Sequence, residues 1–236
     1  MRISAIQATC ASIRGPGAVM LLAALGLPGA SGRAQTVDAG TLVILSGATV
    51  VGREEFTVRR GQTAGPGFTI TTKAWYPAAR PAVTLTIALE LGADSLPTAM
   101  QLDVTGPDER RVYVVFGPRR VTVRSVRPNR EAAREYPGGG RYLVADDSAF
   151  ALHALVPRGG GEFAAMTPRA DRREPATAIW AGTERTLVGG VAHTLERVTL
   201  RQGSRVRHLW YDGAGRLMKA EDTGAGLVAE RQEGPR

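Results

Sequence analysis

Cysteine is almost absent from this sequence, which has 236 residues and one cysteine, Cys10. Cys10 precedes an apolar run of the kind found in export signals, so cleavage of that signal would leave no thiol in the chain. A chain without thiols forms neither disulfides nor thiolate metal sites. We therefore expect a hydrophobic core to supply the stability, and 43% hydrophobic residues are enough to build one.

The N-terminus has the features of a secretory signal. Arg2 and Arg14 form a positive flank, and residues 18–27 form an apolar run that is too short to span a bilayer. Pro28 and Gly29 then break the run, and small residues follow. A short buried core helix is the alternative interpretation, but the order of flank, run and small residues favours a signal.

Cleavage is expected after Ala34, with cleavage after Gly32 as the alternative. Residues 1–34 are thus predicted to be a signal peptide, and residues 35–236 a single β-rich domain with a flexible lead-in at 35–40 and a frayed tail at 231–236. The protein is expected to be periplasmic or secreted. No later stretch is long and apolar enough for a transmembrane segment.

Signatures of catalysis are missing as well. The predicted mature chain has no Gly-x-Ser-x-Gly elbow, and its glycine runs at 138–140 and 159–161 lack the ending of a phosphate-binding loop. The three histidines, His153, His193 and His208, do not share metal-ligand spacing on one element. We predict no metal site, no cofactor and no catalytic residues, and favour a protein that is not an enzyme.

Acidic residues are fewer than basic ones, and the formal charge is +8. Two glutamates, Glu131 and Glu135, stand among the arginines of residues 119–141, which are Arg119, Arg120, Arg124, Arg127, Arg130, Arg134 and Arg141. Such a stretch can meet anionic envelope surfaces or a protein partner, although a solvated arginine face is the simpler interpretation. Nucleic acid is not expected, because Tyr136 is the only stacking aromatic there.

Short segments of alternating apolar and polar residues make up most of the chain. In residues 83–89, Val, Leu, Ile and Leu alternate with Thr, Thr and Ala, which places one side chain set on a buried face. Gly, Pro and Asp turns separate such segments, and Asp212-Gly213 with Gly215 forms one of the clearest. The spacing predicts a mainly β protein with a single curved antiparallel meander sheet, a half-barrel or open barrel.

The pattern is interrupted between residues 127 and 161, apart from a brief strand at 142–144. Asp147 or Ser148 can cap a helix there, and the apolar residues that follow predict one short helix at about 147–156 that plugs or covers the sheet. Asp146 and Asp147 with His153 are a candidate cation or catalytic cluster, but acids that complement the dipole at a helix start are the simpler interpretation.

Aromatic residues are scarce, at 6%, and several stand near strand ends, where they can rim a cavity or pack the core. We take as candidate ligand-binding residues Trp75, Tyr76, Phe150, His153, Trp180, Trp210 and Tyr211. A turn at Gln202-Gly203 would place His193 opposite Asp212, which is a possible acid–base pair but more often a polar cross-strand contact.

Three stretches together carry a family resemblance: VVGREEFTV at 50–58, VADDSAFALHALVP at 144–157, and the pattern W-x-D-x-x-G-R-L-x-K from Trp210 to Lys219. They resemble exported bacterial domains of unknown function. The arrangement of strands and helix in those domains is similar to that of the lipoprotein-sorting factors and other half-barrel envelope proteins. The resemblance implies a curved antiparallel sheet that wraps a helix and can hold acyl chains.

These observations favour a non-enzymatic periplasmic binding protein for an apolar or amphipathic ligand, such as a hydrophobic small molecule or a lipid. A structural or partner-binding envelope protein that uses residues 119–141 is the alternative. A hydrolase-type enzyme that uses His153 or His193 is the second alternative.

Overall fold

The computed structural model describes residues 35–62, 65–157 and 159–232. The predicted signal peptide, its cleavage sites and Cys10 lie outside these residues, as do residues 233–236 of the predicted tail. Among the described residues, no helix has the length and the apolar character needed to cross a membrane.

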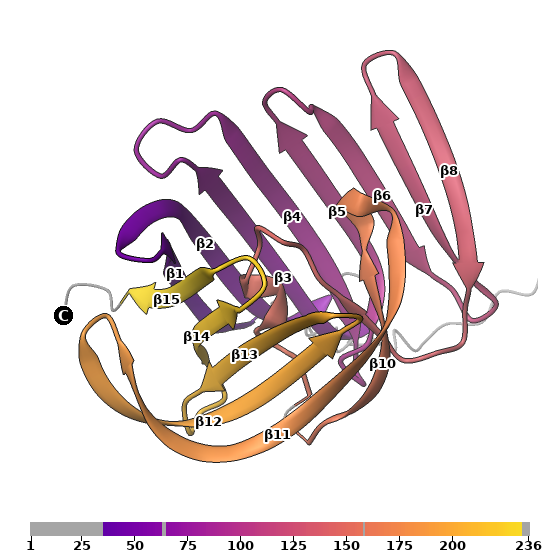
Figure 1. Ribbon diagram of the computed structural model, residues 1–236. Helices are drawn as coiled ribbons and strands as arrows, with labels where there is room; N and C mark the ends of the chain where they lie inside the picture. The colour runs from indigo at the N-terminus through magenta and orange to yellow at the C-terminus, as the bar shows by residue number, and fades with distance from the viewer. Residues whose placement is uncertain (1–34, 63–64, 158, 233–236) are drawn as a thin grey trace, which may run out of the picture. The chain divides into compact units, whose positions relative to one another are not determined.

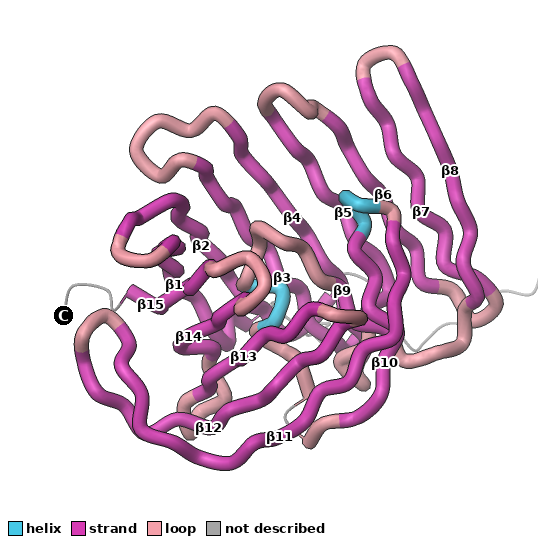
Figure 2. The backbone as a smooth tube through the Cα atoms, viewed as in Figure 1, coloured by secondary structure: helices cyan, strands magenta, loops and turns pink. Residues whose placement is uncertain are grey.

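Strands account for nearly all of the regular structure, which confirms the predicted mainly β class (Figure 2). The two helical turns are of the 3-10 type, η1 (Ala151–His153) and η2 (Pro168–Ala170). The strands are β1 (Gln35–Ser46), β2 (Thr49–Gln62), β3 (Gly65–Tyr76), β4 (Val83–Gly92), β5 (Pro97–Thr105), β6 (Arg110–Phe116), β7 (Arg120–Arg127), β8 (Arg130–Pro137), β9 (Tyr142–Val144), β10 (Gly161–Thr167), β11 (Arg172–Val188), β12 (Val191–Gln202), β13 (Arg205–Tyr211), β14 (Leu217–Asp222) and β15 (Leu227–Gln232).

All of these strands belong to one sheet, in the order β8-β7-β6-β5-β4-β3-β2-β1-β15-β14-β13-β12-β11-β10-β9. Two meanders therefore meet where β1 pairs with β15 in antiparallel register, for example Ile44 opposite Ala229. The predicted antiparallel meander is confirmed for every neighbouring pair except β9 and β10, which run parallel.

The sheet is strongly curved, and its two end strands, β8 and β9, do not pair with each other through a backbone ladder (Figure 1). The two ends of the sheet nevertheless lie close together: the ring centroids of Phe116 on β6 and Tyr142 on β9 are 5.4 Å apart. The Tyr142 hydroxyl donates to the carbonyl oxygen of Pro137, which ends β8. We call this side-chain junction between the β6–β8 end and the β9–β10 end the seam.

Alternation along the strands places the core on the inner face of the curved sheet. On β4, Leu85, Ile87 and Leu89 are buried while Thr86 and Glu90 are exposed. Each aliphatic side chain buried in this way contributes about 1.5–3 kcal/mol to folding. The matched alternation on successive strands joins their inner faces into one continuous core.

Three local expectations were wrong. Residues 35–40 are the first part of β1 rather than a flexible lead-in, because they pair with β2. The helix expected at about 147–156 is only the single turn η1. Strand β8 was not predicted, because seven of its eight residues are exposed and no apolar alternation marks it.

The chain is also ordered further toward its C-terminus than expected. Arg231 lies in β15 and is only 9% exposed. Its Nη2 atom is 2.6 Å from Asp38 Oδ1 and donates to the carbonyl oxygen of Ala39. The guanidinium also lies over the Phe56 ring, 5.3 Å from its centroid. The frayed tail predicted at 231–236 therefore does not include Arg231.

Candidate binding site

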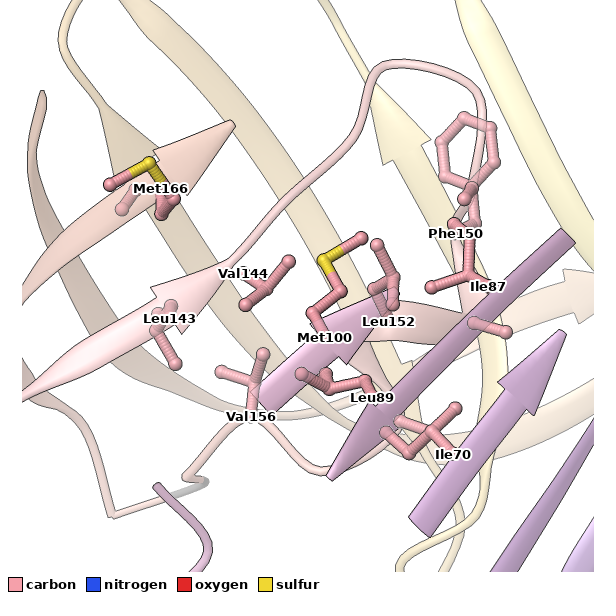
Figure 3. Packing of buried hydrophobic residues seen from close by; sticks show 14 of the residues in the cluster. Ile70, Ile87, Leu89, Met100, Leu143, Val144, Phe150, Leu152, Val156 and Met166 are labelled. Carbon is pink, nitrogen blue, oxygen red and sulfur yellow. The ribbon is translucent and has the colours of Figure 1, made fainter. Parts of the chain in front are cut away.

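The inner face of the sheet carries an irregular stretch of chain, residues 145–157, which we call the inner segment. It connects β9 to β10, and its apolar side chains Phe150, Leu152 and Val156 are at most 5% exposed. They share one core cluster with Ile87, Leu89 and Met100 of the first meander (Figure 3). The expected plug is thus present, although it is not a regular helix.

Side chains, rather than a strand ladder, hold most of the inner segment in place. Among the described residues, its backbone hydrogen bonds beyond Ala145 are internal, such as those that the N–H groups of His153 and Ala154 donate to the carbonyl oxygens of Phe150 and Ala151. Backbone N–H groups need partners when they are buried, so other groups must supply them. The anchors come from β2, β3, η2 and β13.

Glu54 on β2 is the central anchor. Its side chain is completely buried, and its carboxylate accepts hydrogen bonds from the backbone N–H groups of Phe150 (2.7 Å) and Ala151 (3.2 Å). The Thr72 hydroxyl on the neighbouring strand β3 donates a third bond of 2.6 Å. One carboxylate therefore satisfies the N–H groups at the start of η1.

Burial and hydrogen bonding shift the pKa of Glu54 in opposite directions. Burial is the larger effect and raises the pKa of Glu54 to about 7, although the hydrogen bonds from Thr72, Phe150 and Ala151 favour the charged form. The nearby Asp146 carboxylate raises this pKa further. The anchor therefore changes its protonation state close to neutral pH.

Two tyrosines hold carbonyl groups of the inner segment. The Tyr76 hydroxyl donates to the oxygen of Ser148 at 2.8 Å, and the Tyr211 hydroxyl donates to the oxygen of His153 at 2.6 Å. Gly52 on β2 makes room for the first of these rings, since a Cβ atom there would lie 2.4 Å from Tyr76 Cε1. Sheet positions on both meanders thus fix the same short stretch.

Asp146 is paired with Arg169 of η2. The Nε and Nη2 atoms of Arg169 donate to its two carboxylate oxygens at 3.0 and 2.8 Å. This fork geometry is the strong form of an arginine–carboxylate contact. Burial raises the pKa of Asp146, and the charge of Arg169 opposes that rise.

Asp147 is paired instead with arginines of β13. Arg205 Nη1 and Arg207 Nη2 both contact Asp147 Oδ1, the latter at 3.3 Å. Arg207 is only 1% exposed, and its Nε atom donates to Asp222 at 2.9 Å. Its Nη1 atom donates to Gln202 Oε1 at 3.1 Å. A buried cation with this many partners ties the inner segment to the second meander.

His153 has the opposite character, because its ring is buried without polar contacts. It is 1% exposed, and neither ring nitrogen has a hydrogen-bond partner among the described residues. Burial, followed by the charge of Arg207, lowers the pKa of His153 to about 3. The ring is therefore neutral at physiological pH and packs as part of the core.

A pocket of about 330 Å³ adjoins the C-terminal end of the inner segment. This volume is at the lower end of the range for small-molecule sites. We call it the end pocket; it is lined by Val37, Asp38, Val58, Arg60, Phe68, Ala154, Leu155, Val156, Pro157, Tyr211, Ala214, Gly215 and Arg216. Its apolar wall includes Val58, Val156 and Tyr211, which also belong to the core.

Four of the seven candidate ligand-binding residues come together around the inner segment. They are Tyr76, Phe150, His153 and Tyr211. Only Tyr211 among them lines the end pocket.

The three tryptophans are placed elsewhere. Trp75 lies 5.3 Å from the Lys73 ammonium, and Trp180 is 56% exposed. Trp210 belongs to a second, small cluster with Val188, Leu195 and Met218, and its indole N–H donates to Glu184 at 2.7 Å. They do not form a common rim around a cavity, so the tryptophan part of the candidate site is not assembled.

The proposed pair of His193 and Asp212 does not form. The β12–β13 turn lies one residue later than predicted, with Gln202 opposite Arg205, and the ladder ends at Glu196 and Tyr211. His193 is instead opposite Thr186 on β11, while Asp212 pairs with Arg216. His208 lies beside Trp210, with ring centroids 5.9 Å apart.

In the part of the chain that the structure describes, no group of three or more His, Cys, Asp or Glu side chains is placed to hold a metal ion. Asp146 and Asp147 do not share a ligand space, because each carboxylate pairs with different arginines.

Sequence reasoning missed the two residues that matter most to the anchoring, Glu54 and Arg207. Both had a visible signal in their strand phase. Glu54 is two and four residues from Phe56 and Val58, and Arg207 is two and four residues from Leu209 and Tyr211. Residues two apart on a strand share a face, so both charged groups fall on the buried face. A charge in phase with core residues must find polar partners inside the fold.

Comparison with known proteins places the fold but not the activity. No family model matches the chain, and no curated protein matches it. Among solved structures, it is similar to the crystal structure of a beta-barrel-like protein of domain of unknown function DUF1849 from Brucella abortus, with a TM-score of 0.56 and 11% sequence identity over 83% of this chain and 95% of that one. The likeness agrees with the expected resemblance to bacterial domains of unknown function; the resemblance to lipoprotein-sorting factors stays a prediction.

Proposed function

We propose that this protein is an exported, non-enzymatic binding protein that takes an apolar or amphipathic ligand, such as a lipid, onto the inner face of its curved sheet. One observation carries the proposal: the inner segment buries apolar side chains on that face, yet beyond Ala145 its backbone has no ladder with the sheet among the described residues. A ligand can replace such a segment without breaking strand pairing.

The replacement of the inner segment by a ligand would begin at the end pocket. Val156 lines the pocket and also packs in the core, so an outward movement of residues 154–157 would extend the pocket toward Leu89 and Met100. Apolar surface exposed in this way favours an apolar occupant by about 25 cal/mol per Å². The depth of the site thus suits an acyl chain or a comparable group.

The mouth of the end pocket is polar, which suits an amphipathic ligand. Arg60 and Arg216 are exposed residues of its lining, and Asp38, which pairs with Arg231, is a third charged residue there. The Arg60 guanidinium lies over the Phe68 ring, 5.4 Å from its centroid. A ligand with an apolar tail and a polar head would meet both kinds of surface.

The positions of the histidines favour binding over hydrolysis. His193 and Asp212 are not opposite each other. The His153 ring is buried among apolar side chains, where no substrate can reach it without movement of the inner segment. Among the residues that the structure describes, neither histidine is held by a carboxylate in the way that general acid–base catalysis uses.

A fluorescent fatty-acid titration tests the proposal. We expect saturable binding near one ligand per chain. Tyr211→Phe removes one hydrogen bond to the inner segment, worth about 1 kcal/mol, and should tighten binding about fivefold because the segment becomes easier to displace. Tyr113→Phe is the control, since Tyr113 is on β6 and outside the end pocket.

Native mass spectrometry of the gently purified protein is the direct complement, because a co-purified lipid would appear as added mass. The proposal fails if no fatty acid binds in a saturable manner. It also fails if Tyr113→Phe changes the affinity as much as Tyr211→Phe.

The alternative is a structural or partner-binding envelope protein that uses residues 119–141. Its support is β8, an exposed strand that forms a ladder with β7 alone among the described strands and stands at one edge of the sheet. On the outer face, however, Arg120 and Arg124 already pair with Glu135 and Glu131. Charge reversal at these arginines, followed by pull-down from envelope extracts, separates the two functions; unchanged partners contradict the alternative.

A further inference from the structure

A second pocket, of about 390 Å³, lies at the seam and is separate from the end pocket. We call it the seam pocket. The inner face of β6, β7 and β8 forms one side, and η2 with Asp171 forms the other. Five arginines line it: Arg110, Arg127, Arg130, Arg134 and Arg169.

Strand register explains why these arginines converge. Arg127 and Arg130 face each other across the β7–β8 hairpin, and Arg134 is opposite Val123 on the same face. Small side chains, Ser125 and Ala132, form a pair between them and leave space above the sheet. The pocket is therefore open because the large residues stand at its border and the small ones at its floor.

The last two guanidinium groups come from opposite sides of the pocket, Arg110 from β6 and Arg169 from η2. Arg110 of β6 donates from Nη1 to the carbonyl oxygen of Arg169 at 2.8 Å, so the two arginines bridge the seam. The Tyr136 hydroxyl on β8 is also 2.8 Å from the carbonyl oxygen of Asp171. Both contacts fix η2 over the inner face.

The acids around the seam pocket balance only part of its charge. Asp108 pairs with both Arg110 and Arg127. Asp171 pairs with Arg134 at 3.2 Å, and Asp146 pairs with Arg169 at 2.8 Å. Five guanidinium groups thus share three carboxylates.

Arg130 and Arg110 show where the unbalanced charge lies. Arg130 makes no ion pair among the described residues. The buried Arg110 Nε atom has no hydrogen-bond partner there either. Burial lowers the pKa of Arg110, and the charges of Arg127 and Arg169 lower it further. A bound anion would offset both the burial and the repulsion.

We propose that the seam pocket is a binding site for a phosphate monoester dianion, either free or as the terminal phosphate of a lipid head group. Guanidinium groups bind phosphate oxygens in bidentate fashion. The excess of two positive charges matches a phosphate monoester, which carries about −1.5 to −2 at pH 7. A carboxylate or a phosphodiester has a single charge and would leave one arginine unbalanced. The site is independent of the proposed binding of an apolar ligand.

Calorimetric titration with glycerol phosphate tests the proposal, with sulfate as a second dianion and acetate as a monoanion. We expect saturable binding of both dianions and none of acetate. Arg130→Gln should weaken glycerol phosphate binding about tenfold, since one charge-assisted contact is lost. Arg119→Gln is the matched control, because it removes the same charge from the same stretch but lies outside the pocket.

Vesicles distinguish the source of the phosphate. Binding to vesicles with phosphatidic acid, but not to those with phosphatidylglycerol at equal charge, assigns the site to a lipid monoester; binding of glycerol phosphate alone assigns it to a free one. Equal weakening by Arg130→Gln and Arg119→Gln would show a general surface effect and overturn the proposal. Absence of saturable dianion binding, or a preference for an acidic peptide, would also overturn it. Because fatty-acid uptake is measured separately, either outcome leaves the test of the proposed function unaffected.

Discussion

Glu54→Gln is the substitution that tests the anchoring of the inner segment most directly. Glutamine keeps the shape of the side chain and one acceptor oxygen for the N–H groups of Phe150 and Ala151. It removes the charge that burial makes unfavourable. The variant therefore resembles the protonated anchor at every pH.

The magnitude follows from the pKa of Glu54, which rises from 4.5 to about 7 on folding. The folded state then binds the proton more tightly than the unfolded state, so Glu54 favours folding most below pH 4.5, and this advantage is lost as pH rises through 7. One pKa unit corresponds to about 1.4 kcal/mol, so the full effect is about 3 kcal/mol. Between pH 5 and pH 8, we expect the contribution of Glu54 to the free energy of unfolding to fall by about 2–3 kcal/mol.

Urea unfolding of both proteins at pH 5 and pH 8 gives the required measurement. The quantity of interest is the difference in unfolding free energy between the variant and the original protein. Asp146 and His153 titrate in both proteins, so their contributions largely cancel. We expect Glu54→Gln to gain about 2–3 kcal/mol relative to the original protein on going from pH 5 to pH 8, a midpoint shift of roughly 1 M urea.

Glu55→Gln is the control, because Glu55 is an exposed residue next to Glu54 and its ion-pair partner, Arg53, is exposed as well. Its effect should be small at both pH values. The reasoning is refuted if the Glu54→Gln difference is the same at pH 5 and pH 8. It is also refuted if the variant loses stability at pH 8, since the hydrogen bonds would then outweigh burial.

Three further substitutions test other contacts of the site. Arg207→Met should cost about 3 kcal/mol in urea unfolding, because the buried Asp222 loses its 2.9 Å partner and keeps only Arg205 Nε at 3.6 Å. Gly52→Ala should cost about 1–3 kcal/mol and increase proteolysis of the inner segment, because the new Cβ would lie 2.4 Å from a carbon of the Tyr76 ring. His153→Leu should stabilise the protein more at pH 5 than at pH 8. The histidine has a pKa of about 3 when folded and 6.5 when unfolded, so the unfolded state binds a proton below pH 6.5 and the original protein loses stability there. Equal shifts of the urea unfolding midpoint at the two pH values would contradict this.

The sequence predicts a strand where apolar and polar side chains alternate. It does not predict a strand that is extended only because it pairs with its neighbour. The buried set on β4 identifies both the strand and its inner face. Strand β8 has no such set, because it borders solvent and takes its conformation from β7. The parallel pairing of β9 with β10 depends on how the intervening chain returns, which local periodicity does not encode.

The sequence predicted which segment is buried at the candidate site, but it did not predict the residues that hold this segment in place. Phe150 and His153 are buried as expected of a plug. Its attachment depends on Glu54, which is 96 positions from its partner Phe150, and on Arg207, which is 60 positions from its partner Asp147. Both contacts form only in the folded chain. The one-residue error at the β12–β13 turn shows the same limit, because a shift of that size changes which residue faces His193.

The pairing of β1 with β15 has a consequence for how the chain folds. Every other ladder joins strands that follow each other in sequence, so each meander can form through local contacts. The β1–β15 ladder instead joins residues such as Thr41 and Gln232, and its formation closes a loop of nearly the whole described chain. Long-range pairing of this kind slows folding. We therefore expect two early, independently formed meanders and a late docking step that creates the concave interior.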